Sequence, residues 1–351
     1  MARAQISKIA YKTIQQGKSI AGLAHKEISS RIMNFILPDT KLESFNIDKN
    51  LLLKIQNSME LLREEDWNDA ENNIYPKKLL FDEPWLRYLT QYPKIWLDMP
   101  NTWERRRKQN FEDLPKYIDK DNYPQYYLRN FHHQTDGYLS DFSASIYDLQ
   151  VEILFNGSAD AMRRRIIKPI KEGLSVFSER NKNELKILDV ATGSGRTLKQ
   201  LRGAFPKERI IGTDLSGSYL KEASRYISDL DGDLIELIKC NAEDLPFQDN
   251  SLQAISCVYL FHELPRSIRD KVLNEFYRVL EPSGTLVLAD SIQISDSPDF
   301  IEIMENFHKS FHEPFYCDYI KDDLNAKIED LGFHNVKSNS FFMTKVWSAV
   351  K

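Results

Sequence analysis

Residues 185–196 constrain the fold of this chain more than any other stretch. They begin with an apolar run that predicts a buried strand: Ile187, Leu188 and Val190. Small residues follow, among them Gly193 and Gly195, and a helical pattern begins at Arg196. Such a turn suits a nucleotide-like ligand, because glycines let a backbone approach closely and a helix N-terminus offers free N–H groups. The stretch therefore predicts a strand, a tight turn and a helix at a ligand site.

Strand and helix patterns alternate after this turn. Strands are expected at 185–191, 208–214, 234–241, 253–261 and 284–291, with helices at 195–204, 216–230 and 266–280. This alternation predicts a parallel sheet covered on both faces. Near the end, a helix at 322–331 precedes two strands at 335–342 and 344–350, whose short connection requires antiparallel pairing. We therefore predict an α/β fold with a Rossmann-like parallel sheet and a C-terminal antiparallel hairpin.

The residues before this region show mainly helical periodicity interrupted by prolines. We predict two parts: a helical N-terminal region or cap at 1–175 and a ligand-binding domain at 176–351. Residues 1–26 are basic, with no acid before Glu27. A basic helix at the start of a folded domain explains this better than a targeting or membrane-surface signal.

Composition excludes several classes of protein. A net charge of −5 disfavours a non-specific nucleic-acid binder, and no apolar run reaches the roughly 18 residues of a membrane span. We expect no nucleic-acid partner and no stable membrane insertion. The three cysteines form no CxxC pair. Their sparse spacing favours a reducing compartment over a disulfide scaffold or zinc site, so we expect a cytoplasmic protein.

Polar residues end the next strands in a recognisable order. The second strand ends in Asp214, whose carboxylate can accept hydrogen bonds from ribose hydroxyls. The third ends at residues 241–247, N-A-E-D-L-P-F, where a polar side chain can contact an adenine edge. The fourth is followed by residues 259–265, and the helix before the fifth ends in R-V-L-E-P-S-G at 278–284.

With these residues, the region 184–351 resembles the class I S-adenosylmethionine-dependent methyltransferases. That family shows D-x-G-x-G-x-G at the turn, an acid after the second strand, D-A-x-x-L-P-F after the third and R-V-L-x-P-G-G before the fifth. Four motifs in order make a specific signal. This chain departs from the pattern at three positions, with Ala191 and Ser283 in place of glycines and Asn241 in place of aspartate. The resemblance is greatest to small-molecule methyltransferases, including those that act on quinones, and it implies S-adenosylmethionine as cofactor.

The resemblance also implies roles for individual residues. The pocket for the methionine moiety would be shaped by Asp189, Ala191, Gly193 and Gly195. Asp214 would hold the ribose and Leu215 would pack near the adenine, whose edge would contact Asn241, Ala242 and Glu243. Tyr259 would begin the loop beside the methyl-bearing sulfonium. For Asp189 and Asp214 the alternative is a purely structural helix or turn cap.

Several related activities do not fit. The D/N-P-P-Y/F sequence of amino-methylating nucleic-acid enzymes does not follow the fourth strand, and no proline precedes a cysteine as in cytosine-C5 enzymes. Leu198 takes the place of the third glycine of a dinucleotide fingerprint, which makes NAD a poor alternative.

Residues 123–175 are expected to cover the acceptor. The aromatic segment 122–138 can stack on a flat ring, and it resembles uncharacterised cyanobacterial and plastid methyltransferases. Its adjacent His132 and His133 have no third ligand in register, so we predict no metal. For the arginines at 163–165, a solvated helix face is favoured over a grip on an anionic group.

Methyl transfer from a sulfonium depends mainly on aligning donor and acceptor, and a base matters only for a hydroxyl or an acidic carbon. His262, just after the fourth strand, is the first candidate base, and His133 is the second. The sequence thus predicts methyl transfer to an oxygen or carbon of a small aromatic or isoprenoid acceptor. Two alternatives stay open, a protein methyltransferase and a non-catalytic S-adenosylmethionine-binding assembly factor or regulator. The oligomeric state is also open.

Overall fold

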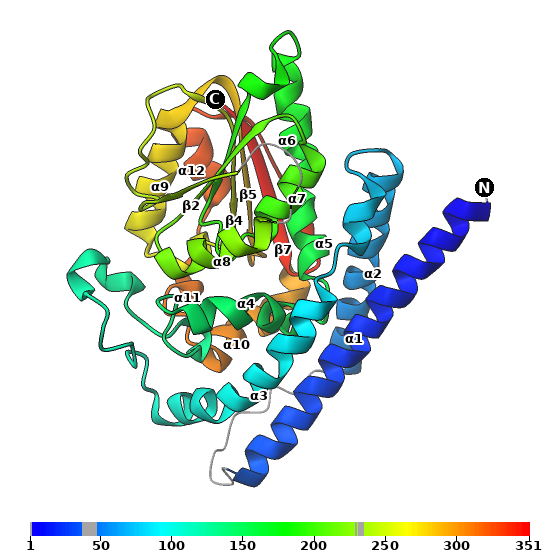
Figure 1. The fold of residues 1–351 in the computed structure, drawn as a ribbon, viewed down its shortest axis with the longest axis vertical. Helices are drawn as coiled ribbons and strands as arrows, with labels where there is room; N and C mark the ends of the chain where they lie inside the picture. Colours follow the sequence, from blue (N-terminus) through cyan, green and yellow to red (C-terminus); the bar gives the residue numbers. More distant parts are fainter. Residues whose placement is uncertain (1, 37–47, 229, 231–234) are drawn as a thin grey trace.

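A mixed sheet organises the chain, shown in Figure 1 as a computed structural model. The structure describes residues 2–36, 48–228, 230 and 235–351. Within this part, seven strands pair in the order β3-β2-β1-β4-β5-β7-β6. The strands are β1 Lys186–Val190, β2 Arg209–Asp214, β3 Glu236–Lys239, β4 Leu252–Val258, β5 Leu280–Ser291, β6 His334–Phe341 and β7 Thr344–Val350.

The pairing confirms the predicted fold class. Strands β1 to β5 run parallel, and β7 pairs antiparallel with both β5 and β6. The strand predicted at 253–261 ends earlier, at Val258, because Tyr259 takes a left-handed φ of 58° and residues Phe261–Glu263 form a 3-10 turn. Residues 1 and 37–47, residue 229 of the helix predicted at 216–230 and residue 234 of the strand predicted at 234–241 lie outside the described residues.

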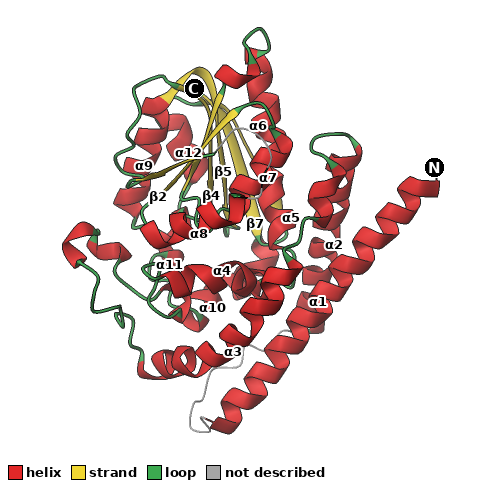
Figure 2. Cartoon of the chain, in the orientation of Figure 1, coloured by secondary structure: helices red, strands yellow, loops and turns green. Residues whose placement is uncertain are grey.

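Helices lie on both faces of the sheet and beyond the carboxyl ends of its parallel strands (Figures 1 and 2). Those against the sheet are α6 Ile167–Leu174, α7 Arg196–Ala204, α8 Gly217–Ile227, α9 Arg266–Val279 and α12 Leu324–Asp330. The others are α1 Ala2–Ile36, α2 Lys49–Glu71, α3 Trp85–Lys108, α4 Asp141–Leu154, α5 Ala159–Arg163, α10 Ile301–Ser310 and α11 Tyr316–Tyr319. Helices α4, α10 and α11 lie below the carboxyl ends in Figure 1, where the predicted cap was expected.

Strand β5 shows how the sheet separates two apolar cores. Its Leu286 and Leu288 pack with residues of α9 and α12, whereas Val287 and Ala289 pack with residues of α6 and α7. This alternation follows from the period-2 geometry of a strand. The second core also contains residues from the N-terminal region: Tyr11, Trp67, Tyr75, Leu79 and Leu80. The division into 1–175 and 176–351 stays a prediction, and an apolar core crosses it.

The arginines at 163–165 are buried, so the expectation of a solvated helix face was wrong. The buried Asp66 of α2 accepts hydrogen bonds from Arg164 Nε at 2.8 Å and from Arg165 Nη2 at 2.7 Å. The hydroxyls of Tyr11 and Tyr75 donate to the same carboxylate at 2.6 and 2.7 Å. The counter-charges therefore come from inside the protein, from a helix about 100 residues away in sequence.

Two of the departures from the family motifs carry backbone strain. Ala191 and Ser283 replace family glycines, and their φ values are 56° and 69°. A side chain in this left-handed region costs roughly 1–2 kcal/mol. The chain thus keeps the backbone that glycine would adopt and accepts the strain of a small side chain.

None of the described helices combines the length and the apolar character that a membrane crossing requires.

The carboxylate of Asp66 is expected to be a large contributor to stability. Replacing it in Asp66→Asn leaves two buried guanidinium groups without a full counter-charge, so the free energy of unfolding should fall by about 3–5 kcal/mol. Urea denaturation followed by circular dichroism measures this change. Glu27→Gln, which breaks the exposed pair with Arg31, is the control and should cost no more than about 0.5 kcal/mol. Equal effects of the two substitutions would contradict the role given to Asp66.

Candidate active site

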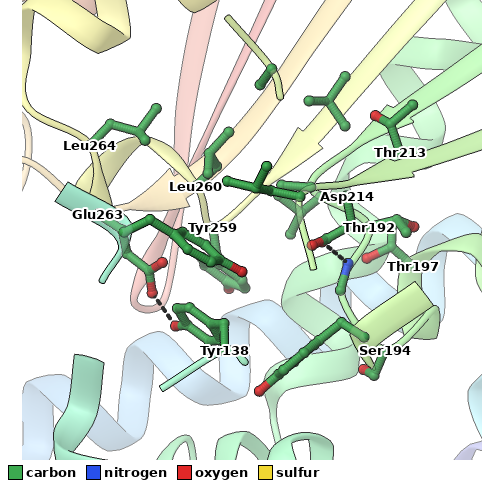
Figure 3. Close-up of a pocket in the computed structure, with 18 of the residues that line it drawn as sticks. Tyr138, Thr192, Ser194, Thr197, Thr213, Asp214, Tyr259, Leu260, Glu263 and Leu264 are labelled. Carbon is green, nitrogen blue, oxygen red and sulfur yellow. Dashed lines mark hydrogen bonds between the residues drawn. The ribbon is translucent and has the colours of Figure 1, made fainter. Parts of the chain in front are cut away.

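Two cavities lie at the carboxyl ends of the parallel strands. The first is enclosed by the turn after β1, the ends of β2 and β4, residues after β3 and a group of tyrosines (Figure 3). The second, of about 470 Å³, lies among α1, α3, α4, α10 and the β6–β7 turn. Tyr147 of α4 and Tyr259 line both cavities, so the two cavities are neighbours that share a wall.

Most of the residues assigned to the cofactor line the first cavity. They are Ala191, Gly193, Asp214, Leu215, Asn241, Ala242 and Tyr259. Each follows the end of a parallel strand, which is where ligands bind in open α/β sheets. The fold therefore brings together residues that span about 70 positions of sequence.

Asp214 fixes the backbone at the centre of this cavity. Its carboxylate accepts hydrogen bonds from the N–H groups of Gly193 and Ser216, both at 2.8 Å, and Figure 3 shows the first of these. Asp214 therefore does cap these turns, which was the structural alternative to ribose binding. Each carboxylate oxygen can accept a second bond, so the group can still bind hydroxyls. Burial raises the pKa of Asp214 to about 6, against the opposing effect of these backbone donors.

Asp189 and Gly195 lie behind the cavity wall rather than on it. Asp189 is buried and accepts hydrogen bonds from the hydroxyls of Thr192 and Ser256, both at 2.6 Å. It thereby connects β1, the turn and β4. At Gly195 a Cβ atom would meet the Cβ of Ala223 at 2.9 Å, so glycine allows α8 to pack closely. Asp189 thus shapes the site through its hydrogen bonds, and Gly195 through the close packing that it allows.

Glu243 also stands outside the cavity lining. Its Oε1 accepts hydrogen bonds from the Tyr126 hydroxyl at 2.7 Å and from Asn241 Nδ2 at 3.1 Å. It thereby orients two side chains that do line the cavity. A position along the adenine edge stays a prediction for Glu243.

The N-terminal region supplies the part of the first cavity that sequence reasoning missed. Its tyrosines in the lining are Tyr126, Tyr127, Tyr138 and Tyr147. The Tyr138 hydroxyl donates to Glu263 (Figure 3), and Ser216 Oγ donates to the Tyr138 carbonyl at 2.6 Å. Ser194 in the glycine turn donates to Asp148 of α4 at 2.6 Å. The aromatic segment signalled ring contacts, but nothing in the sequence indicated which ring faces the cofactor side.

The second cavity is mainly apolar. Its apolar lining comes from several helices and the β6–β7 turn, and includes Ile95, Met99, Val151, Phe155, Met304, Phe307 and Met343. Its polar lining includes His132, His262 and Ser291, and also His25, Lys26, Asp98, Thr102 and Gln150. A flat, largely apolar molecule with a few oxygen atoms matches such a lining.

His262 belongs to this second cavity and is paired with a carboxylate. Its Nδ1 lies 2.6 Å from Asp290 Oδ1. Burial alone would lower the pKa of His262, but Asp290, with Glu263 and Glu313 farther away, raises it to about 10. With this raised pKa, the imidazole of His262 is protonated at neutral pH, and both of its ring nitrogens are hydrogen-bond donors. A protonated histidine cannot accept a proton, so the pairing with Asp290 does not favour His262 as a base. That role stays a prediction.

The structure does not bring His133 to either cavity. Its ring lies near Phe111 and His312, and burial together with Arg106 lowers its pKa to about 3. The neighbouring His132 lines the second cavity instead. Both histidines have left-handed φ values, 54° and 57°, so no helical or strand periodicity could show which ring points inward.

Known methyltransferases are similar to this chain in sequence. A sequence-family model described as a methyltransferase domain matches residues 187–284. A demethylmenaquinone methyltransferase of Thermotoga maritima is 31% identical over 188 residues, covering 54% of this chain and 75% of the relative. A ubiquinone/menaquinone biosynthesis C-methyltransferase of Desulfotalea psychrophila is 30% identical over 151 residues, covering 43% of this chain and 56% of the relative. The chain thus spans between about half and three quarters of the length of these relatives.

Solved structures with a similar arrangement include human N-acetylserotonin methyltransferase in complex with S-adenosylmethionine. Its TM-score is 0.48 at 11% identity, and the match covers 72% of this chain and 66% of that one. Magnesium protoporphyrin IX methyltransferase from Synechocystis PCC 6803 has a TM-score of 0.38 at 12% identity, over 56% of this chain and 83% of that one.

The raised pKa of Asp214 generates a pH prediction. Only the carboxylate can accept both ribose hydroxyls, so the affinity for S-adenosylhomocysteine should be constant above about pH 6 and fall below it, by up to about tenfold per unit. Calorimetric titration at several pH values measures this. Asp214→Asn should bind at least about tenfold more weakly and lose the pH dependence. If the variant keeps that dependence, it belongs to another group, and Asp189, whose pKa burial also raises to about 6, is the next candidate.

Proposed function

Because the chain belongs to the class I S-adenosylmethionine-dependent methyltransferases, we propose that it transfers the methyl group of S-adenosylmethionine to a small, mainly apolar acceptor. The cofactor would occupy the first cavity and the acceptor the second. The observation that carries this proposal is the wall of Tyr147 and Tyr259 shared by the two cavities. Donor and acceptor would meet at this wall.

The residues of the first cavity suit the parts of the cofactor. Asp214 would accept the ribose hydroxyls, and Asn241 and Ala242 would lie along the adenine beside Leu215. The turn at Gly193 would leave room for the methionine moiety, because the space next to its Cα is open, with Tyr219 Cδ1 the nearest atom at 3.9 Å from a Cβ placed there.

The apolar lining of the second cavity supports an acceptor of the quinone or isoprenoid kind. The names of two similar proteins refer to demethylmenaquinone and to ubiquinone and menaquinone biosynthesis. In this chain the ring would lie near Tyr259 and His262, and an apolar chain would extend toward Ile95 and Met99. We propose a carbon or an oxygen of that ring as the methylated atom.

The chemistry requires alignment more than acid or base. A nucleophilic carbon or oxygen attacks the methyl carbon, the sulfonium C–S bond breaks, and S-adenosylhomocysteine leaves as a neutral thioether while the acceptor gives up a proton. Holding the two reactants in line can supply about 7–11 kcal/mol of the barrier reduction. The aromatic wall would exclude water from the methyl group while it is transferred.

Turnover tests this function directly. We expect purified protein with S-adenosylmethionine to form S-adenosylhomocysteine with reduced demethylated quinones, measured by mass spectrometry of both products. Gly193→Arg should abolish this, because the new side chain would project into the first cavity. Tight cofactor binding with no turnover on quinols or on acceptor-rich extracts would instead favour the non-catalytic alternative.

A pair of tryptophan substitutions tests the acceptor cavity. Val151→Trp adds bulk to the lining of the second cavity and should lower kcat/KM for the acceptor at least about tenfold, or ~1.4 kcal/mol. The affinity for S-adenosylhomocysteine should stay the same, because Val151 does not line the first cavity. Val176→Trp, at a position 61% exposed and remote from both linings, is the matched control. Equal activities of the two variants would exclude the second cavity as the acceptor site.

A further inference from the structure

Four metal-ligating side chains converge where the two cavities meet. One ligand atom from each of His132, His262, Glu263 and Glu313 lies within 4.8 Å of all the others. The residues come from three separate segments: the 3-10 turn Phe131–His133, the 3-10 turn Phe261–Glu263 and the loop after α10. Glu263 lines the first cavity, whereas His132 and His262 line the second.

Glu313 is the first sign that this cluster holds a ligand. Its side chain is buried, and neither carboxylate oxygen accepts a hydrogen bond from any described residue. Oε1 lies 3.1 Å from His132 Nε2 without the alignment of a hydrogen bond. A buried carboxylate without donors is costly, and a cation at the cluster would remove that cost.

The orientation of His262 is a second, independent sign. Its Nδ1 is held by Asp290, which also accepts a hydrogen bond from the Phe261 N–H at 2.7 Å. Nε2 is left facing the cluster, 3.9 Å from Glu263 Oε1. A histidine that binds a metal through one ring nitrogen commonly donates its other N–H to a carboxylate, which fixes the tautomer and the ring.

His132 completes the group from the opposite side. Its Nε2 is 3.4 Å from Glu263 Oε1, so the same nitrogen faces both glutamates. A set of ion pairs between protonated histidines and carboxylates would explain these short distances. It would not explain why Glu313 accepts no aligned hydrogen bond.

We propose that His132, His262, Glu263 and Glu313 bind one divalent transition-metal ion. Two imidazole nitrogens and two carboxylate oxygens are a donor set typical of zinc. The sequence predicted no metal because the His132–His133 pair had no third ligand, and the fold supplies that ligand from distant segments. If the proposed function holds, the ion lies beside the ring of the acceptor and can bind an acceptor oxygen, which makes His262 a ligand rather than a base.

Metal binding by the whole protein is the first experiment, and it needs neither cofactor nor acceptor. Protein freed of metal with a chelator is titrated with Zn²⁺ against a chromophoric competitor, and with Co²⁺ while visible absorption is recorded. We expect one equivalent to bind with a Kd near or below about 1 µM and Co²⁺ to show d–d bands of a low-coordinate site. Absence of stoichiometric binding by the unaltered protein would overturn the proposal without any variant.

Substitutions then locate the ion. His132→Gln and Glu313→Gln should each weaken Zn²⁺ binding by at least about tenfold, and His133→Gln, one residue away, should leave it unchanged. Circular dichroism and thermal unfolding establish whether each variant is folded. If one of the two ligand variants does not fold, the other one provides the test. Unchanged affinity in both would assign the ion elsewhere, for example to the cluster of Glu83, Glu152 and Asp160, and would refute the site.

Metal binding and methyl transfer are measured independently, so either can fail without the other. Stoichiometric Zn²⁺ binding that depends on His132 and Glu313 supports the site even if no acceptor is found. Methyl transfer by protein that binds no metal would support the function and remove the ion from it.

Discussion

The carboxylate of Asp66 holds the first N-terminal helices to the segment that packs on the sheet. It lies on α2, receives the guanidinium groups of Arg164 and Arg165, and is contacted by the hydroxyl of Tyr11 on α1. The arginines directly precede α6, which packs on the sheet, so this buried charge cluster attaches the N-terminal helices to it. A buried charge needs an oppositely charged or hydrogen-bonding partner in a well-defined position. The cluster therefore fixes how these segments lie relative to one another. Helices α3 and α4 are held to the sheet domain by direct contacts as well, through the ion pair of Arg87 with Glu222 and the hydrogen bond from Ser194 to Asp148.

The first cavity rests on a more local constraint. Asp189 and Asp214 both sit at the carboxyl ends of adjacent parallel strands and bind the turn between β1 and α7. One uses hydroxyl donors and the other backbone N–H groups. Because these hydrogen bonds fix the turn before any ligand binds, the cavity is preorganised. Ala191 keeps a left-handed backbone in this turn at a cost that the surrounding hydrogen bonds offset.

The junction of the cavities concentrates buried charge. Asp290, Glu263 and Glu313 face His262 and His132 with few other donors, and burial raises the pKa of Glu313 to about 7. Each of these groups loses its hydration on burial, and ionisable groups with perturbed pKa values cluster at functional sites. They lie beside the shared tyrosine wall, next to the cavity proposed for the acceptor. Proton sharing and metal binding are the two chemical uses of such a group, and the unbonded oxygens of Glu313 favour the second.

The sequence by itself determined the sheet, the glycine turn and the place of Asp214, Leu215, Asn241 and Ala242 at strand ends, because strand periodicity and motifs next to strand ends are local properties. Tertiary structure alone decided that Arg164 and Arg165 are buried, since their partner carboxylates, Asp66 and Asp69, lie far away along the chain. It also chose His132 over His133 and brought Glu313 to His262. These segments are irregular, so no period fixes where a side chain points, and only packing between distant elements sets it.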